Sequence, residues 1–251
     1  MTGYPAPATS GPIRPRTYSL SELLDGIFKI YRANFELFAS ISLVLALPDI
    51  VFVLLGWSRY SGIMRFFLAP LLLATLYLAT SHVIYRGPAS AVDILRDGFN
   101  RYGNFAGVYA RLILAVLALL IPPLGIWLIV RWASAPSVLA CEPVTPGQAV
   151  KRSAQLVEGL WWRTFGRLII IILLETILAL VLGFSAGIAL AIVPGLDISS
   201  KAMAVAILAQ ILGALVVPLV PIGYTLLYID LRVRKEGIDL DSLAKSATDA
   251  A

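Results

Sequence analysis

Long apolar stretches separated by short polar segments run through most of this chain of 251 residues. They cover residues 35–57, 66–85, 105–121, 124–141, 164–193 and 202–231. Each is near or above the ~17 apolar residues that cross a hydrocarbon layer as a helix. Pro122, Pro123 and Gly125 interrupt the region 105–141, so two short spans fit it better than one long helix. The pattern therefore predicts six transmembrane helices.

A segment with apolar residues at helical spacing opposite a polar face stands before the first, third and fifth apolar stretch. Capping-box residues mark each predicted helix start: Ser19 and Glu22, Ser90 and Asp93, and Thr145 and Gln148. We therefore predict interfacial amphipathic helices over 19–34, 90–104 and 146–162. These helices either anchor the chain at the membrane surface or form a platform that contacts lipid headgroups or a partner protein.

The composition places the chain among integral membrane proteins. Hydrophobic residues make up 59% and charged residues 14%, with a mean hydropathy of +0.86, whereas about a quarter of residues are charged in soluble proteins. Most lysines and arginines fall before or between the predicted hairpins, and only Arg59, Arg65 and Lys201 fall in the connecting turns. This asymmetry predicts that both termini are cytoplasmic. The net charge of +5 predicts attraction to anionic lipid headgroups at the cytoplasmic face and requires no nucleic acid.

The predicted fold is an all-α integral membrane protein with six transmembrane helices arranged as three hairpins. A cytoplasmic amphipathic interfacial helix precedes each hairpin, so the organisation repeats three times. Residues 1–18 are predicted to form a disordered Pro-rich tail, 19–235 the polytopic membrane domain, and 236–251 a polar C-terminal tail.

The charged residues predicted to lie inside the membrane are Asp49, Arg111, Arg131 and Glu175. Arg131 and Glu175 are each ten residues from a predicted cytoplasmic helix end, which places both roughly 15 Å deep. A charge at the centre of a helix costs at least ~2.5 kcal/mol, so we predict that these two form an intramembrane polar pair. The pair either fixes how the second and third hairpins pack or belongs to a binding site. Asp49 is a further deep charge, and Arg111 is shallower.

Two smaller groups of residues have predicted structural roles. Trp161, Trp162 and Arg163 are typical of interfacial anchors, because indole rings prefer the level of the headgroups. Gly183 and Gly187 form a ridge of small residues that is predicted to allow close helix packing.

Candidate catalytic chemistry is sparse along the sequence. His82, the single histidine, is interpreted as an interfacial polar residue, and Cys141, the single cysteine, as a small residue at a helix end. The sequence has no phosphate-binding glycine loop, nucleophile elbow or zinc-ligand spacing. We therefore predict no enzyme activity, no metal site and no cofactor.

Two segments carry a resemblance to a known family. The first is TYSLSELLDGIFKIYRANF at the start of the membrane domain. The second begins with Arg131 and Trp132 and continues with Ala149, Arg152, Ser153, Leu156, Gly159 and Trp162. Together they resemble the bacterial membrane-domain family named after glycerophosphoryl diester phosphodiesterase. The resemblance implies a membrane domain without the soluble phosphodiesterase domain, so the family name is not carried over as an activity.

The predicted function is that of a non-enzymatic polytopic protein of the bacterial inner membrane. Its role is predicted to be a scaffold, an accessory subunit or a lipid-interacting module. The alternative is a small transporter or channel whose polar site includes Asp49, Arg131 and Glu175. An enclosed cavity that reaches these charges would favour transport, whereas a dry ion pair would favour a scaffold.

Overall fold

A computed structural model describes residues 17–87, 89–192, 194 and 197–236. The predicted tails therefore lie outside the described residues, apart from Thr17, Tyr18 and Glu236. Within the described ranges the chain is helical and contains no β-strand. The α-helices are α1 (Leu20–Ala33), α2 (Phe35–Leu54), α3 (Ser61–Tyr85), α4 (Ala91–Asn100), α5 (Tyr102–Leu117), α6 (Pro122–Trp132), α7 (Ala135–Cys141), α8 (Pro146–Val157), α9 (Trp161–Ala191), α10 (Ile198–Val216) and α11 (Leu219–Glu236). Two 3-10 helices, η1 (Ser58–Tyr60) and η2 (Ala118–Leu120), lie in turns.

Six helical stretches are long and apolar enough to cross a membrane. They are Phe35–Leu54, Ser61–Tyr85, Tyr102–Leu120, Pro122–Cys141, Trp161–Ala191 and Ile198–Glu236. Each matches one of the apolar runs of the sequence, so the all-α class and the six apolar helices are confirmed. The chain thus has the features of a multi-pass membrane protein, with its orientation still a prediction.

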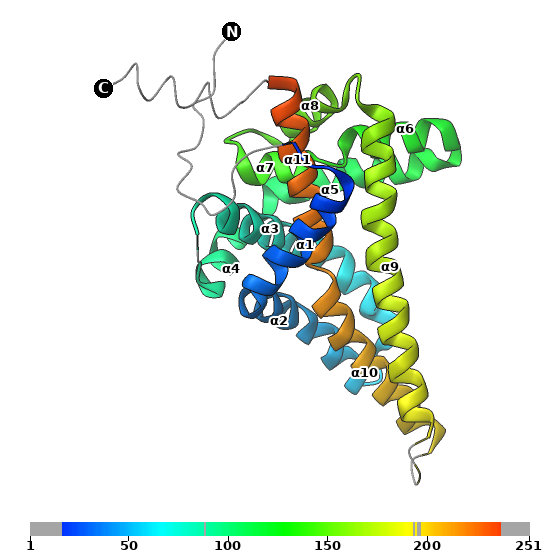
Figure 1. The fold of residues 1–251 in the computed structure, drawn as a ribbon. Coiled ribbons are helices and arrows are strands. Elements are labelled where there is room, and N and C mark those ends of the chain that lie inside the picture. Colours follow the sequence, from blue (N-terminus) through cyan, green and yellow to red (C-terminus); the bar gives the residue numbers. More distant parts are fainter. Residues whose placement is uncertain (1–16, 88, 193, 195–196, 237–251) are drawn as a thin grey trace.

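Helix α11 forms the centre of the molecule (Figure 1). It packs against α1, α3, α7, α8 and α9, and Ile222, Leu227 and Tyr228 on it are fully buried. Pro218 separates α11 from α10, because proline lacks the N–H that would continue the helical hydrogen bonds. The hydroxyl of Tyr31 on α1 donates a hydrogen bond of 2.5 Å to the carbonyl oxygen of Leu215 at this break. Helix α1 therefore satisfies a backbone group at the junction of α10 and α11.

The first predicted amphipathic segment forms α1, and the other two form α4 and α8. The predicted ends at 104 and 162 are wrong, because α4 ends at Asn100 and α8 at Val157, and the following residues belong to α5 and α9. Ser19 with Glu22 and Thr145 with Gln148 form complete capping boxes. The predicted capping box at Ser90 is not formed, because the Ser90 side chain makes no capping hydrogen bond to α4. Helix α1 packs on α11, α4 on α3, and α8 on α5, α6 and α7. Each helix thus covers part of the helical core, and its position at a membrane surface stays a prediction.

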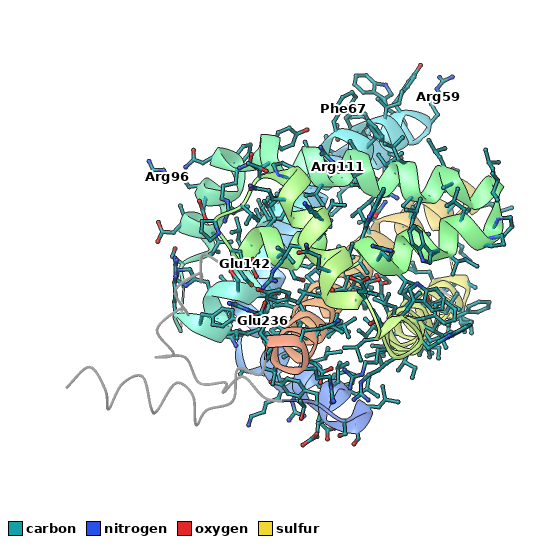
Figure 2. All side chains as sticks on the ribbon, turned by 90° about the horizontal axis from the view of Figure 1, so that it is seen from above. Arg59, Phe67, Arg96, Arg111, Glu142 and Glu236 are labelled. Carbon is teal, nitrogen blue, oxygen red and sulfur yellow. The ribbon has the colours of Figure 1, made fainter. Side chains whose placement is uncertain are left out.

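The apolar helices do not all point the same way. In Figure 1, α9 and α10 descend together to the lower tip, whereas α5 and α6 run across the upper part of the view. Seen from above in Figure 2, α9 and α11 are viewed nearly end-on, while the green helices α5 and α6 are seen side-on and lie across the picture. The two views agree that the α5–α6 hairpin runs across the direction of α9.

Candidate intramembrane binding site

A cavity of about 280 Å³ lies between α2, α3 and α10. Leucine, alanine, glycine and valine residues form most of its wall, and four polar residues complete it. The lining residues are Ser42, Leu45, Ala46, Asp49, Arg65, Leu68, Ala69, Leu72, Gln210, Gly213, Ala214 and Val217. The cavity lies just below the ~300 Å³ at which small-molecule pockets usually begin.

An ion pair closes one end of this cavity. Nε of Arg65 on α3 lies 2.6 Å from Oδ2 of Asp49 on α2. The Asp49 side chain is 13% exposed and that of Arg65 is 51% exposed, so the carboxylate faces inward and the guanidinium is accessible. Oδ1 of Asp49 is buried and has no hydrogen-bond partner within the described chain. This end therefore presents an unused buried acceptor beside an accessible cationic donor.

The opposite end is almost entirely apolar. Leu72 and Val217 close it, together with Ser42, which is buried and whose hydroxyl oxygen has no partner among the described residues. The two ends are seven residues apart on each of α2, α3 and α10, which corresponds to ~10 Å along a helix. The cavity is thus an elongated space with a charged end and an apolar end.

Small residues in the walls of α2, α3 and α10 leave the space that forms the cavity. A Cβ atom added at Gly213 would meet no atom within 4 Å, so the glycine opens the wall instead of allowing a tight helix contact. Ala46 and Ala69 face the same space from α2 and α3. Hydropathy does not distinguish an alanine that lines a cavity from one that packs, which is why the sequence did not predict this site.

Among the ion pairs of the described residues, none joins Arg131 to Glu175. The Arg131 guanidinium instead lies over the Trp127 ring, 4.3 Å from its centroid. Glu175 is partly buried on α9. The predicted pair does not form because the matched depth assumed one straight helix through residue 141, whereas α6 ends at Trp132.

Both arginines of the second hairpin lie beside α8. The hydroxyl of Ser153 on α8 donates a 2.7 Å hydrogen bond to the carbonyl oxygen of Arg131. Nη1 of Arg111 donates to the carbonyl oxygen of Gly107 at 2.7 Å, and a Cβ added at Gly147 of α8 would lie 3.7 Å from Arg111 Nη2. Arg111 and the backbone of Arg131 therefore lie beside α8.

The three predicted interfacial anchors at the start of α9 differ in their surroundings. Trp162 is 78% exposed, which suits contact with headgroups. Trp161 is partly buried and stacks on Phe165, with ring centroids 5.1 Å apart. Arg163 is exposed, and its Nη2 donates a 3.4 Å hydrogen bond to the carbonyl oxygen of Tyr18. Trp162 and Arg163 are thus accessible at the surface, whereas Trp161 packs against Phe165.

Gly183 and Gly187 do not mark a close helix contact within the described chain. A Cβ added at either glycine would meet no atom within 4 Å. The small residue of this region that does pack is Ala186, which is buried. The predicted ridge therefore faces away from the neighbouring helices.

Sequence reasoning missed a buried cluster around Asp230 of α11. Its side chain is fully buried, and Oδ1 accepts a 2.7 Å hydrogen bond from the backbone N–H of Tyr18. Oδ2 accepts from Arg167 of α9 and, at 3.0 Å, from Nε of Arg234, while Nε of Arg163 lies 4.0 Å away. Arg167 also donates to the Tyr18 carbonyl oxygen. The cluster ties together the chain before α1, the start of α9 and the end of α11.

A second polar network lies on the opposite face of α11. The Tyr228 hydroxyl donates a 2.6 Å hydrogen bond to Oε1 of Glu142, which is buried. Arg152 of α8 pairs with both Glu142 and Glu236, so the two carboxylates labelled in Figure 2 share one guanidinium. Arg232 completes the network, with its Nε 2.8 Å from Oε2 of Glu236. Acidic residues at the ends of apolar runs are the sequence signal that could have indicated both networks.

His82 and Cys141 line a second cavity, of about 150 Å³, between α3, α4 and α7. Arg86 and Arg101 also line it, and Nη2 of Arg101 donates to the carbonyl oxygen of Leu139. Nδ1 of His82 is buried without a partner in the described part of the chain. Among the described residues, no group of three or more His, Cys, Asp or Glu side chains is placed to hold a metal ion.

No protein-family model, no curated protein and no solved structure matches this chain. The resemblance to the phosphodiesterase-named membrane domain therefore stays a prediction, and the site has to be interpreted from its own geometry.

Proposed function

We propose that this protein is a non-enzymatic, lipid-interacting membrane protein whose α2–α3–α10 cavity binds part of a single phospholipid. The observation that carries the proposal is the Asp49–Arg65 ion pair at one end of an otherwise apolar cavity. An elongated apolar space with one charged end matches the amphipathic form of a lipid. A cavity of about 280 Å³ encloses only part of such a molecule, so the rest of the lipid lies along the outer helix surfaces.

The charged end favours a zwitterionic headgroup with N–H donors. Arg65 supplies donors to a phosphate, which guanidinium groups bind well. Oδ1 of Asp49 is a buried acceptor without a partner in the described chain, and burying such an atom unpaired costs free energy. The ammonium group of a phosphatidylethanolamine can fill this role, whereas a choline headgroup has no N–H to donate.

The proposed setting is the bacterial inner membrane, with both termini in the cytoplasm. Arginine and lysine asymmetry supports the orientation, and the resemblance to the bacterial membrane-domain family supports the setting. Arg65 lies near the non-cytoplasmic start of α3 in this orientation, so the bound headgroup belongs to the outer leaflet. Anionic headgroups at the cytoplasmic face are proposed as further, less specific partners.

The alternative function, transport, requires one polar site that contains Asp49, Arg131 and Glu175. The cavity reaches Asp49 but is not lined by Arg131 or Glu175. We therefore propose lipid binding over transport, and an uptake assay in proteoliposomes separates the two.

Native mass spectrometry of the protein released from nanodiscs tests the proposal. The variant is Gly213→Leu, which fills the cavity without a clash at Cβ, and the matched control is Gly183→Leu, another mid-helix glycine with open space but outside the cavity. We expect the wild type and control to retain one phosphatidylethanolamine and Gly213→Leu to bind it at least ten-fold more weakly. Equal retention by all three proteins would refute the proposed site.

A further inference from the structure

The α5–α6 hairpin differs from the other two hairpins in the chemistry of its turn. From Leu112 to Val130 the sequence has no polar residue. The turn residues Leu119, Leu120 and Ile121 are all exposed, and Leu120 is 89% exposed. Gly125 allows this turn to close tightly, since a Cβ there would lie 2.4 Å from the backbone nitrogen of Leu119. The tip is thus a compact, fully apolar surface.

The other two turns carry residues that suit a membrane surface or water. The α2–α3 turn contains Trp57, Arg59 and Tyr60, a combination typical of the headgroup level. After the α9–α10 turn, Asp197 caps the start of α10 and Lys201 lies in the first residues of that helix. A hairpin that crosses the bilayer needs such residues at its far end, and the α5–α6 hairpin has none in its turn.

The position of α8 limits how far the hairpin reaches. The exposed side chains of α8 are polar (Gln148, Lys151 and Gln155), so this helix faces water or headgroups. The guanidinium of Arg111 lies close to Gly147 of α8, and the carbonyl oxygen of Arg131 accepts a hydrogen bond from Ser153 of α8. Both residues therefore lie at the depth of α8. Leu120 is nine residues from Arg111 and eleven from Arg131, which is at most ~14 to 17 Å of helix. A hydrocarbon core is ~30 Å thick, so the tip does not reach the other side.

The orientation of the α5–α6 hairpin further reduces the depth that its tip reaches in the bilayer. Figures 1 and 2 show α5 and α6 running across the direction of α9, which is the longest apolar helix. If α9 crosses the bilayer, α5 and α6 extend sideways beneath the level of α8.

We propose that the α5–α6 hairpin is a re-entrant element that turns inside the hydrocarbon of the leaflet next to α8. Its partner is the acyl-chain region of that leaflet, and the chain crosses the membrane four times. Arg111 and Arg131 remain at the headgroup level, which removes the cost of two charges in the bilayer centre. This proposal does not depend on lipid binding in the α2–α3–α10 cavity.

Depth measurements with nitroxide labels test the proposal. Single cysteines replace the exposed residues Leu114, Leu117, Leu120 and Leu124 in vesicles of phosphatidylethanolamine and phosphatidylglycerol, with the unsubstituted protein giving the background from Cys141. Collision with oxygen and with a water-soluble nickel complex gives the depth of each label. We expect depth to increase toward a single maximum at Leu120.

The α2–α3 hairpin provides the matched control. Labels at Val51, Trp57 and Ile63 are all at exposed positions and are expected to show headgroup-level exposure to nickel at Trp57. A label at Leu120 that collides with nickel, together with reaction of the unlabelled Leu120→Cys thiol with an impermeant maleimide from the side opposite α8, would show six crossings and overturn the proposal. Low collision with both reagents at Leu120 would show that protein covers the tip and would overturn the lipid assignment.

Discussion

Nε of Arg65 lies 2.6 Å from Oδ2 of Asp49, while the second oxygen of the same carboxylate has no partner within the described chain. The pair is therefore asymmetric. Arg65 can extend toward water because its long side chain lies near the start of α3. Asp49 is held in the cavity wall next to Pro48 of α2. An aspartate in this position is available to a ligand without breaking its bond to Arg65.

The asymmetry predicts unequal effects of removing each partner on protein stability. Arg65→Met leaves a buried carboxylate unpaired and should lower the free energy of unfolding by about 3 kcal/mol. Asp49→Leu leaves a half-exposed guanidinium that can reach water, and should cost about 1 kcal/mol or less. Unfolding in mixed micelles measures both values. Equal losses for the two variants would contradict the proposed orientation of the pair.

The Asp230 cluster predicts a graded series of stability losses. Asp230→Ala leaves Arg167 buried with like charges nearby and should cost ~3 to 5 kcal/mol. Arg167→Met should cost less, because Arg234 and the Tyr18 N–H still contact Asp230. Arg234→Met serves as the control and should cost under ~1 kcal/mol, since its side chain is 27% exposed. A loss in Arg234→Met as large as in Asp230→Ala would rule out this order.

Tyr228→Phe removes one hydroxyl group and so tests the polar network that Tyr228 forms with Glu142. Glu142 is buried, so removal of its 2.6 Å hydrogen bond should cost ~1 to 3 kcal/mol in the free energy of unfolding. Tyr224→Phe on the same helix is the matched control, because the Tyr224 hydroxyl makes no hydrogen bond within the described residues. Thermal unfolding of the two variants side by side should therefore separate them clearly, and indistinguishable midpoints would argue against the network.

The start of α10 should depend on pH through Asp197. Hydrogen bonds from Ser199 and Ser200 lower the pKa of Asp197 below its ordinary value, so the charged form caps the helix. A depressed pKa in the folded state means that this stabilisation is present at neutral pH and begins to be lost as pH falls below ~4.

Hydrogen exchange at Ser199 and Ser200 measures this capping effect. Asp197→Ala should speed exchange at pH 7, and the difference from the wild type should shrink below pH ~4. Asp197→Asn keeps a side-chain acceptor and should give an intermediate, pH-independent result. A wild-type-to-alanine difference that stays constant down to pH ~3 would show that charge has no part in the cap.

The sequence predicted the long apolar helices well because hydrocarbon imposes both a minimum length and an apolar composition. It also predicted the capped starts of α1 and α8, since a capping box is a local pattern of residues a few positions apart. The partners of the charged residues were not predicted in the same way. Arg131 was assigned a depth on the assumption of a continuous helix, and the end of α6 at Trp132 invalidates that assumption.

The candidate cavity could not be predicted from the sequence, for a different reason. Asp49 was recognised as a deep charge, but its partner Arg65 comes from the next helix, and pairing them requires the tilt of both. The cavity itself depends on side chains that are missing at Gly213 and Ala46, which only a packed arrangement makes visible. Short sequence patterns therefore predict the individual helices, whereas the packing of the helices determines which charged residues form ion pairs.

Photo-crosslinking with a diazirine-bearing phosphatidylethanolamine tests lipid binding in the cavity most directly. Helix α2 supplies both sets of reporter positions, because Leu45 lines the cavity while Val44, Leu47 and Val51 are exposed on the outer face. The account predicts adducts at Leu45 and at Leu68 and Leu72 of α3, competed by unlabelled phosphatidylethanolamine and lost in Gly213→Leu. Adducts confined to Val44, Leu47 and Val51, unchanged by competitor or by the variant, would contradict a lipid-binding cavity.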